Sequence, residues 1–278
     1  MNLLNGNEVS KNILDNLKPR IEKLKERDII PQLCIILVGE NRDSILYVNQ
    51  KQKYCNKRDI LCTTHKLDEN VGENEIIELL NQLNNDNNVH GIIIELPLPK
   101  HLNKNNILKN INSKKDIDGY NPINTGKLLL NYDKYLSPCT PKACLEILKY
   151  YNILLIQKNI VIVGSGNIGI PLSILLLQQN ATVTICHIYT KNIKEFTQKA
   201  DIIISCCGSP KLIKKDWVRD NSVILDCGIN YMENKLVGDV DYENVKDKCL
   251  YITPVPGGVG PVTVSVLISQ LIDICEDL

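Results

Sequence analysis

The sequence of 278 residues has no excess charge of either sign, because it holds 32 Lys+Arg and 32 Asp+Glu residues. A chain without net charge has no general attraction for nucleic acids or anionic membranes, so its ligands must be captured at local sites. An uninterrupted apolar run of about 18 residues, the signature of a membrane span, is also absent. The N-terminal segment lacks a signal-peptide apolar core and an Arg-rich transit pattern. We therefore expect a cytoplasmic protein with no nucleic-acid or membrane partner.

The 11 cysteines do not form a recognisable disulfide or metal framework. Their number is odd, no C-x-x-C pair occurs, and no Cys/His cluster has the spacing of a zinc site. Reduced thiols in a cytosol-like compartment fit this pattern better than a secreted scaffold does. We expect no metal site.

The first half of the chain alternates between two kinds of apolar pattern. Helical spacing over residues 9–24 predicts an N-terminal helix, and helical patterns recur at residues 45–55 and 73–83. Short apolar runs at residues 33–38 and 91–96 are typical of buried parallel strands. This β/α alternation predicts a parallel sheet covered by helices.

A second β/α series follows the proline-containing segment 138–141 and a helical pattern at residues 143–151. Its predicted strands span residues 159–163, 182–186, 202–205, 222–226 and 251–253. Strands separated by helices in this way predict a doubly wound Rossmann-type dinucleotide-binding domain.

The expected fold class is therefore α/β, with two domains and a cleft between them. An N-terminal α/β domain with a parallel sheet spans residues 1–138, and a C-terminal helix at residues 264–278 returns to it. The Rossmann-type domain spans residues 139–263. A chain of this length is long enough for two domains of ordinary size.

The clearest single motif is a complete G-x-G-x-x-G sequence between a predicted strand and a predicted helix. Its residues are Gly164, Ser165, Gly166, Asn167, Ile168 and Gly169. The first glycine permits the turn, the second lets a pyrophosphate approach the backbone, and the third lets the helix pack closely on the strand. The motif alone would be weak, but its position after a strand and before a helix predicts a nicotinamide dinucleotide cofactor.

The type of dinucleotide depends on the end of the next strand. NAD normally requires an Asp or Glu there, to bind the ribose hydroxyls. The segment 187–191 has neither acid, and Lys191 lies within it, which favours NADP. His187 in the same segment can equally be a solvated residue at the strand end.

Residues 254–263 contain three glycines and three prolines in ten positions. Glycine permits positive φ and close backbone approach, whereas proline fixes φ and removes a hydrogen-bond donor. An ordinary turn before a helix is the alternative for any single Gly-Pro pair. The density of both residues predicts a rigid loop that presses against a flat ligand.

A candidate reaction site lies in the first domain. Tyr47 and Lys51 are four residues apart and so share one helical face, where an aromatic ring and a cation could hold a planar substrate. Such a pair is commonly only a boundary residue beside a solvated charge. Two further segments support a site: residues 95–99 (ELPLP) at a predicted strand end and residues 115–120 (KDIDGY) in a predicted loop.

Taken together and in this order, the motifs resemble those of the bifunctional methylenetetrahydrofolate dehydrogenase/cyclohydrolase family. The resemblance spans nearly the whole chain. It is carried by residues 31–33, Tyr47, Lys51, residues 91–99, 115–119, 138–141, 226–230, 238–241 and the Pro/Gly loop, as residues 254–263 are called from here on. It implies oxidation of 5,10-methylenetetrahydrofolate to the 5,10-methenyl form with NADP (or NAD), followed by hydrolysis to 10-formyltetrahydrofolate. It also implies a homodimer, tetrahydrofolate derivatives as partners, and a place in one-carbon metabolism and purine biosynthesis.

The resemblance implies roles for individual residues. Tyr47 would stack on the folate ring, Lys51 would act in acid/base or water-activating chemistry, and Asp118 would bind the pterin. With Glu95, these residues form the expected catalytic set. The other expected substrate contacts are Leu96, Pro97, Pro256, Gly257, Gly258, Val259, Gly260 and Pro261. Ile188 and Ile229 join the glycine motif as expected cofactor contacts. The alternative role of Asp118 is loop capping, since Asp-Gly is a common turn pair.

Two departures from the family pattern affect function. Glu95 stands where the family has the glutamine that positions the lysine, and a carboxylate there favours the ammonium form of Lys51 and opposes its use as a base, unless burial protonates Glu95. We therefore expect weakened or differently tuned hydrolysis with dehydrogenase activity retained. The glycine motif also lacks the family's arginine, which weakens the argument for NADP.

Three alternatives remain open. The chain could be a dehydrogenase-only member with weak cyclohydrolase activity and NAD preference, or a folate- or nucleotide-binding protein without catalysis. Retention of Tyr47, Lys51 and Asp118 argues against the second. An unrelated NAD-dependent dehydrogenase would share the glycine motif but would leave the motifs of the first domain unexplained.

Overall fold

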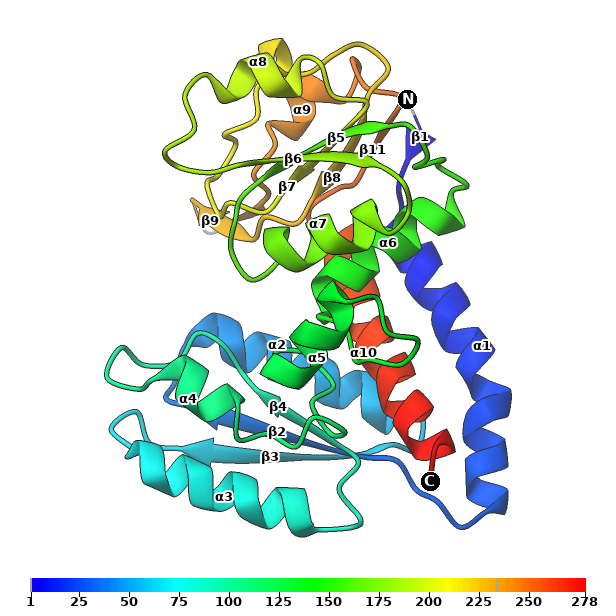
Figure 1. Cartoon of the computed structure of the whole chain (residues 1–278), viewed down its shortest axis with the longest axis vertical. Helices are drawn as coiled ribbons and strands as arrows, with labels where there is room; N and C mark the ends of the chain where they lie inside the picture. Colours follow the sequence, from blue (N-terminus) through cyan, green and yellow to red (C-terminus); the bar gives the residue numbers. More distant parts are fainter. Residues whose placement is uncertain (1, 234) are drawn as a thin grey trace. The chain divides into compact units, whose positions relative to one another are not determined.

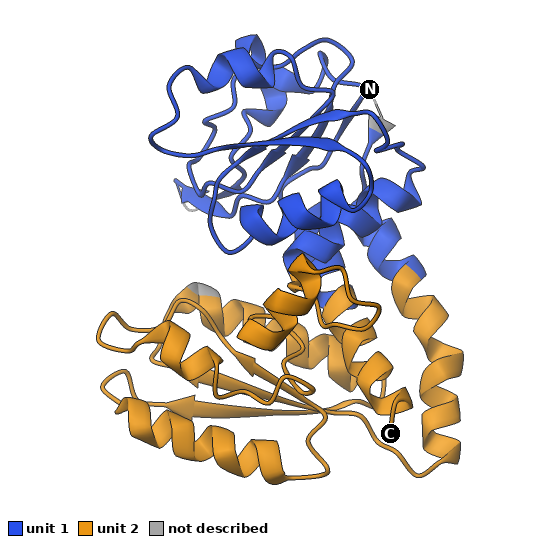
Figure 2. Ribbon diagram, viewed as in Figure 1, with its two compact units in different colours: residues 1–12, 140–265 blue, residues 13–139, 266–278 orange. Residues whose placement is uncertain are grey.

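A computed structural model describes residues 2–233 and 235–278. The chain forms two compact units, shown in separate colours in Figure 2. Unit 1 contains residues 1–12 and 140–265, and unit 2 contains residues 13–139 and 266–278. The N-terminal residues thus group with the unit that carries the glycine motif. Each unit has its own parallel sheet and its own buried core, and each is described separately.

Unit 2 is built on a three-stranded parallel sheet of order β3-β2-β4. Its strands are β2 (Gln32–Val38), β3 (Leu61–Leu67) and β4 (Gly91–Ile94). Its helices are α2 (Arg42–Asn56), α3 (Glu73–Asn85), α4 (Lys104–Leu108) and α5 (Pro122–Leu129), with the later part of α1 (Gly6–Glu26) and the end of α10 (Val259–Glu276). All are labelled in Figure 1. Alternate residues of β2 and β4 pack against α3 and α4 in one buried cluster, as period-two alternation requires.

Two sequence expectations for this sheet need correction. Strand β3 was not predicted, because it lies at the sheet edge and its half-exposed residues do not make an apolar run. The strand expected at residues 91–96 ends at Ile94. Glu95 still donates its backbone N–H to the carbonyl of Ile36, at 2.9 Å, but Pro97 has no N–H to extend the ladder.

Unit 1 is built on a six-stranded parallel sheet of order β1-β11-β8-β7-β5-β6. Its strands are β1 (Asn2–Leu3), β5 (Asn159–Val163), β6 (Thr182–Cys186), β7 (Ile202–Ser205), β8 (Val223–Asp226) and β11 (Tyr251–Ile252), and a small hairpin adds β9 (Asn230–Met232) and β10 (Lys235–Val237). Its helices are α6 (Cys139–Tyr150), α7 (Gly169–Leu177), α8 (Ile193–Thr197), α9 (Tyr242–Val245) and a 3-10 turn at Lys215–Trp217. The strand order reverses between β5 and β7, because β6 lies on one side of β5 and β7 on the other.

The N-terminal residues join unit 1 through backbone contacts. Strand β1 pairs in parallel with β11, and the N–H of Gly6 donates to the carbonyl of Gly257 at 2.9 Å. A Cβ on Gly6 would lie only 1.7 Å from the carbonyl oxygen of Gly258. The start of the chain is therefore fitted closely to the Pro/Gly loop, and Gly6 is required for that approach.

Two helices begin earlier than the sequence pattern indicates. Helix α10 starts at Val259 instead of residue 264, and α6 starts at Cys139 instead of residue 143. In both helices a proline, Pro261 or Pro141, occupies the first turn, where its missing N–H has no helical partner to lose. Val259, Gly260 and Pro261 are therefore helical, and the Pro/Gly loop ends at Gly258.

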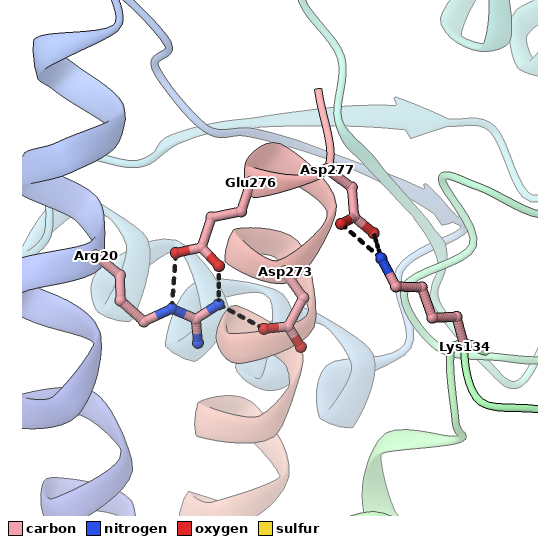
Figure 3. Close-up of polar contacts among 5 residues, drawn as sticks. All are labelled: Arg20, Lys134, Asp273, Glu276 and Asp277. Carbon is pink, nitrogen blue, oxygen red and sulfur yellow. Dashed lines mark hydrogen bonds and ion pairs between the residues drawn. The ribbon is translucent and has the colours of Figure 1, made fainter.

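Helix α10 is long and apolar enough to cross a membrane by length and composition, and 61% of its 18-residue window is buried within the protein. A core helix passes the same test, so this is weak evidence for a membrane span. Within unit 2 its end is tied to α1 by ion pairs (Figure 3). Arg20 binds Glu276 through two nitrogens at 2.9 and 2.6 Å and Asp273 at 2.6 Å.

Candidate functional site

The central feature of unit 2 is a buried pair formed by Lys51 and Glu95. Lys51 projects from α2, and Glu95 is the first residue after β4. The Nζ atom of Lys51 lies 2.5 Å from Oε2 of Glu95, and the two side chains are only 10% and 7% exposed. The sequence therefore brings together two residues 44 positions apart, one from a helix and one from the carboxyl end of a parallel strand.

The environment of Glu95 makes its charged form costly. Burial raises the pKa of this carboxyl, and the neighbouring ammonium of Lys51 acts in the opposite direction. Asp118 lies close enough to raise the pKa of Glu95 further. Lys51, Glu95 and Asp118 thus form one electrostatically linked group in unit 2. A cation and a carboxylate in contact can share a proton, so the group can donate or accept one at a bound substrate.

Tyr47 and the Pro-containing segment flank this pair. Tyr47 lies one helical turn before Lys51 on α2, on the same face, and is partly buried. Leu96 packs against the core cluster of the sheet, whereas Pro97 is exposed. The peptide bond between these two residues is cis. The aromatic ring and the strand-end segment are therefore both available beside the ion pair.

The loop that carries Asp118 is held at both ends. Lys115 donates to the carbonyls of Leu83, Asn84 and Asp86 at 2.7 to 3.0 Å, which caps the end of α3. Gly119 has φ +68, and a Cβ there would lie 2.5 Å from the backbone carbon of Ser137. These contacts fix the backbone on either side of Asp118.

A second buried carboxyl organises the same loop from inside. Asp116 is 1% exposed and accepts hydrogen bonds from the N–H groups of Tyr120 and Asn121 and from the side-chain amide of Asn124. Burial raises its pKa to about 7. Gln270 was not predicted from the sequence, yet its buried amide donates to the carbonyls of Ile117 and Ser137. A glutamine in an apolar helix pattern gives little sign of such a role.

In unit 1 the glycine motif has three distinct structural requirements. Gly164 has φ +127, and a Cβ on it would meet the carbonyl oxygen of Cys206 at 2.5 Å. A Cβ on Gly169 would lie 1.9 Å from the carbonyl oxygen of Gly164, so helix α7 approaches the loop closely. Leaving out Gly166 and its two chain neighbours, no heavy atom of the described residues lies within 4 Å of a Cβ built on Gly166. Space is therefore open beside this exposed glycine, as a loop that holds a pyrophosphate needs.

The other motif residues and the strand end after β6 are solvent-accessible. Ser165 and Asn167 are exposed, and Ile168 precedes the first residue of α7. Ile188 is 89% exposed in a turn closed by the hydrogen bond from Thr190 N–H to the carbonyl of His187. No carboxylate stands in the segment 187–191. The turn therefore offers no acceptor of the kind that binds the ribose hydroxyls of NAD.

One expected and one unexpected segment follow the neighbouring strands. Ile229, after β8, is 43% exposed. The segment 206–209 after β7 was not predicted to belong to the site, although the Cys-Gly-Ser-Pro sequence at residues 207–210, just after a buried strand, is a turn signal. It contacts the glycine motif directly, because Cys206 Sγ donates to the carbonyl of Gly164 at 3.6 Å.

The Pro/Gly loop of unit 1 is rigid for identifiable reasons. Gly257 has φ +101, and a Cβ on Gly258 would lie 2.4 Å from the carbonyl oxygen of Pro254. A Cβ on Gly260, in the first turn of α10, would meet nothing within 4 Å.

Over residues 2–233 and 235–278, no group of three or more His, Cys, Asp or Glu side chains is arranged to hold a metal ion.

Comparison with known families accounts for both units. Residues 4–118 match the family model described as tetrahydrofolate dehydrogenase/cyclohydrolase, catalytic domain. Residues 138–277 match the model described as tetrahydrofolate dehydrogenase/cyclohydrolase, NAD(P)-binding domain. The two matches together cover most of the chain.

Individual relatives agree over their whole lengths. The bifunctional protein FolD of Campylobacter concisus is 44% identical over 274 residues, covering 98% of this chain and 96% of its own. The crystal structure of bifunctional FolD from Campylobacter jejuni superposes with a TM-score of 0.97 at 43% identity, covering 100% and 99% of the two chains. The methylenetetrahydrofolate dehydrogenase-cyclohydrolase of Trypanosoma brucei, solved with NADP and an inhibitor, has a TM-score of 0.94 at 32% identity, covering 98% and 96%.

Proposed function

We propose a function for this chain from its family, since it belongs to the tetrahydrofolate dehydrogenase/cyclohydrolase family. In this proposal it oxidises 5,10-methylenetetrahydrofolate and then hydrolyses the methenyl product to 10-formyltetrahydrofolate. The observation that carries this proposal is the buried Lys51–Glu95 pair, with Tyr47 one turn away and Asp118 near the carboxyl. These residues lie in the part of the chain that matches the catalytic-domain model.

In the oxidation half, the protein has to bind and orient its two ligands. The nicotinamide cofactor supplies the hydride acceptor when bound, and the folate nitrogen supplies the electrons that stabilise the product cation. We assign the pyrophosphate to the loop from Gly164 to Gly169, where Gly166 leaves open space and α7 begins. Tyr47 provides a flat apolar surface for the pterin, and Asp118 a hydrogen-bond acceptor for its N–H groups.

In the hydrolysis half, water must be activated beside the cationic methenyl carbon. We assign this step to Lys51 and its partner Glu95, since they are the buried groups in this cluster that can exchange a proton. The carboxylate of Glu95 places a negative charge directly against the amine of Lys51, where a neutral amide would place none. We therefore propose that hydrolysis is slower relative to oxidation than in an enzyme with a neutral amide at position 95.

We propose NADP as the preferred cofactor. The segment 187–191 lacks the acid that NAD requires, and Lys191 is present to attract a phosphate. The Trypanosoma brucei relative was solved with NADP. Comparison of initial rates with NADP and NAD tests this assignment, and a higher kcat/KM with NAD would refute it.

We also propose a cellular setting for the enzyme, and the same family membership supports it. We propose a homodimer in the cytosol that acts in one-carbon metabolism and supplies formyl groups for purine biosynthesis. The described cysteines are all free, which is consistent with a reducing compartment. Sedimentation equilibrium of the purified chain tests the dimer, and a monomer at micromolar concentration would contradict it.

One spectrophotometric experiment tests both activities. The purified chain is mixed with 5,10-methylenetetrahydrofolate and NADP, and formation and decay of the methenyl product are followed. We expect cofactor-dependent formation and decay faster than the spontaneous rate. A protein that binds folate and NADP but catalyses neither step would support the non-catalytic alternative, whereas formation without accelerated decay would indicate a dehydrogenase-only enzyme.

A further inference from the structure

The strand order of unit 1 defines a topological switch point. The main strands are numbered 1 to 5 along the chain, as β5, β6, β7, β8 and β11. Across the sheet their order is then 2-1-3-4-5, so the topological switch point lies between β5 and β7. Ligands of open α/β sheets bind outside the carboxyl ends of the strands at such a point. One wall of this position is the glycine motif after β5. The other wall is the segment 206–209 after β7, which reaches Gly164 through Cys206.

The second wall is held by a single carboxylate, that of Asp239. This side chain is fully buried. Its Oδ2 accepts hydrogen bonds from the backbone N–H groups of Cys207 and Gly208 at 2.9 and 3.2 Å and from the Ser205 hydroxyl at 3.0 Å. Its Oδ1 accepts from the Ser209 N–H at 2.9 Å. Four hydrogen-bond donors at and just after the end of β7 therefore bind the carboxylate of Asp239, which lies about 30 residues further along the chain.

The same carboxylate reaches the segment after β8. The side-chain amide of Asn230 donates to Oδ1 of Asp239 at 2.9 Å. Ile229, the expected cofactor contact, precedes Asn230 directly. Asp239 thus connects the segments that follow the neighbouring strands β7 and β8, and β7 is the strand that borders the switch point.

A second buried carboxylate, Asp226, holds Asp239 in place. Asp226 accepts hydrogen bonds from the N–H groups of Gly228, Asp239 and Val240 at 2.9 to 3.0 Å. A Cβ on Gly238 would lie 1.9 Å from Oδ2 of Asp226, and one on Gly228 would lie 2.3 Å from the Asp239 carboxyl. The D-x-G-x-N and G-D-V-D sequences, which the reaction chemistry does not use, are therefore the two halves of one support.

We propose that Asp239 is a positioning residue for dinucleotide binding, which shapes the wall formed by residues 206–209 and the approach of Ile229 without touching the cofactor itself. This inference rests on the proposed function, since it takes the switch point to be the cofactor site. Each carboxylate oxygen of Asp239 accepts at least two hydrogen bonds. If asparagine replaced Asp239, its NH₂ group would take the place of one oxygen in either orientation and would face at least two hydrogen-bond donors. The site needs a carboxylate.

The test is direct titration of the purified chain with NADP and with NADPH, followed by calorimetry and by NADPH fluorescence. We expect Asp239→Asn to raise the Kd for both by about tenfold or more, because hydrogen bonds to a charged group are lost from the wall. Hydrolysis of added methenyltetrahydrofolate, which consumes no dinucleotide, should stay within about twofold of wild type. This split between binding and hydrolysis is what a general loss of structure would not produce.

A matched control and a milder variant complete the experiment. Asp201 also accepts a backbone N–H, that of Asn159 at 2.9 Å, but at the amino end of β5. Asp201→Asn should therefore leave the Kd unchanged. Ser205→Ala removes one hydrogen bond from a fully buried hydroxyl and tests the same wall if Asp239→Asn does not fold. We expect it to weaken NADP binding by about threefold to tenfold.

The outcomes separate the inference from the proposed function. If folded Asp239→Asn or, in its place, Ser205→Ala binds NADP as tightly as wild type, the positioning role of Asp239 is wrong and the proposed function stands. If Asp201→Asn weakens binding equally, the effect is one of general stability and the inference is again wrong. If the wild-type chain binds neither NADP nor NAD, the proposed function and the inference both fail.

Discussion

The ammonium of Lys51 and the carboxylate of Glu95 are in direct contact, 2.5 Å apart, within a region of unit 2 that is almost closed to solvent. A neutral amide at position 95 could hold the lysine in place without influencing its charge. A carboxylate holds it in place and also puts a negative charge beside the amine. We therefore expect the rate of the hydrolytic step in this chain to depend on the charge at position 95.

The first prediction concerns the replacement Glu95→Gln. The amide keeps a hydrogen-bonding side chain beside Lys51 but removes the negative charge next to its amine, so we expect methenyltetrahydrofolate hydrolysis to rise by about threefold to tenfold. Oxidation with NADP should change less, because hydride transfer needs no proton acceptor at this position. Stopped-flow absorbance of both reactions measures the ratio. An unchanged hydrolysis rate at the level of other family members would show that Glu95 does not tune the step.

The second prediction concerns the pH dependence of stability. Burial raises the pKa of Asp116 to about 7 and that of Asp226 to about 6, from an ordinary 3.8. The folded state therefore binds these protons more tightly than the unfolded chain, and their contribution to stability is present below the ordinary pKa and lost as pH rises through the folded value. The free energy of unfolding should fall between about pH 4 and pH 7, by up to about 1.4 kcal/mol per pH unit for each proton.

Urea unfolding followed by circular dichroism over this pH range measures the slope. Asp116→Asn should make the fall shallower, since an amide does not titrate. Asp133→Asn, which alters an exposed carboxyl in the same unit, should leave it unchanged. A slope of opposite sign, with stability rising from about pH 4 to pH 7, would be incompatible with buried carboxyls of raised pKa.

The third prediction separates two glycines of one motif. A methyl group on Gly166 meets no neighbour, so Gly166→Ala should leave the free energy of unfolding within about 0.5 kcal/mol while weakening NADP binding by about tenfold or more, because it fills the space beside the pyrophosphate. Gly169→Ala places a carbon 1.9 Å from the Gly164 carbonyl oxygen and should destabilise the fold by about 1–3 kcal/mol. Thermal unfolding and NADP titration of both variants distinguish the effects. Equal losses of stability would contradict this division of roles.

The fourth prediction concerns the ion pairs in Figure 3. The Arg20 guanidinium binds two carboxylates and is 31% exposed, whereas Lys134, paired with Asp277, is 81% exposed. We expect Arg20→Met to lower the free energy of unfolding by about 1 kcal/mol, with a smaller loss at high salt, and Lys134→Met to have an effect near zero. Urea titrations at low and high salt measure both. A larger effect for Lys134 would show that burial and geometry do not rank these pairs.

Much of the fold could be predicted from local patterns. The strands β5, β6, β7, β8 and β11 of unit 1 lie where apolar runs bounded by turn residues predict them, whereas the short strands β1, β9 and β10 have no such run. The G-x-G-x-x-G loop lies between strand and helix as its spacing indicates. Strand β3 could not be predicted, because an edge strand with half-exposed side chains has no apolar run. The starts of α6 and α10 were placed too late, since Pro141 and Pro261 look like helix breakers but are accepted in a first turn.

The site could be predicted only in part. The resemblance to a family indicated that Glu95 stands beside Lys51, and the two side chains do meet; their catalytic roles stay a prediction. The supports provided by Gln270 and Asp239 could not be predicted, because each holds segments distant along the chain. A buried polar residue in an apolar pattern is a weak signal until its partners are placed. The Gly-Asp sequence at residues 238–239 was visible, but its purpose depends on the contact with Asp226.

The central claim is that Lys51 is required for hydrolysis of the methenyl group, while the glycine motif binds the dinucleotide cofactor. The most direct test is the rate of methenyltetrahydrofolate decay with wild type and with Lys51→Met, alongside NADP titration of both proteins. We predict that wild type accelerates decay over the spontaneous reaction, and that Lys51→Met falls to within about threefold of the spontaneous rate with an unchanged Kd for NADP. A Lys51→Met protein that hydrolyses the folate as fast as wild type would contradict the claim.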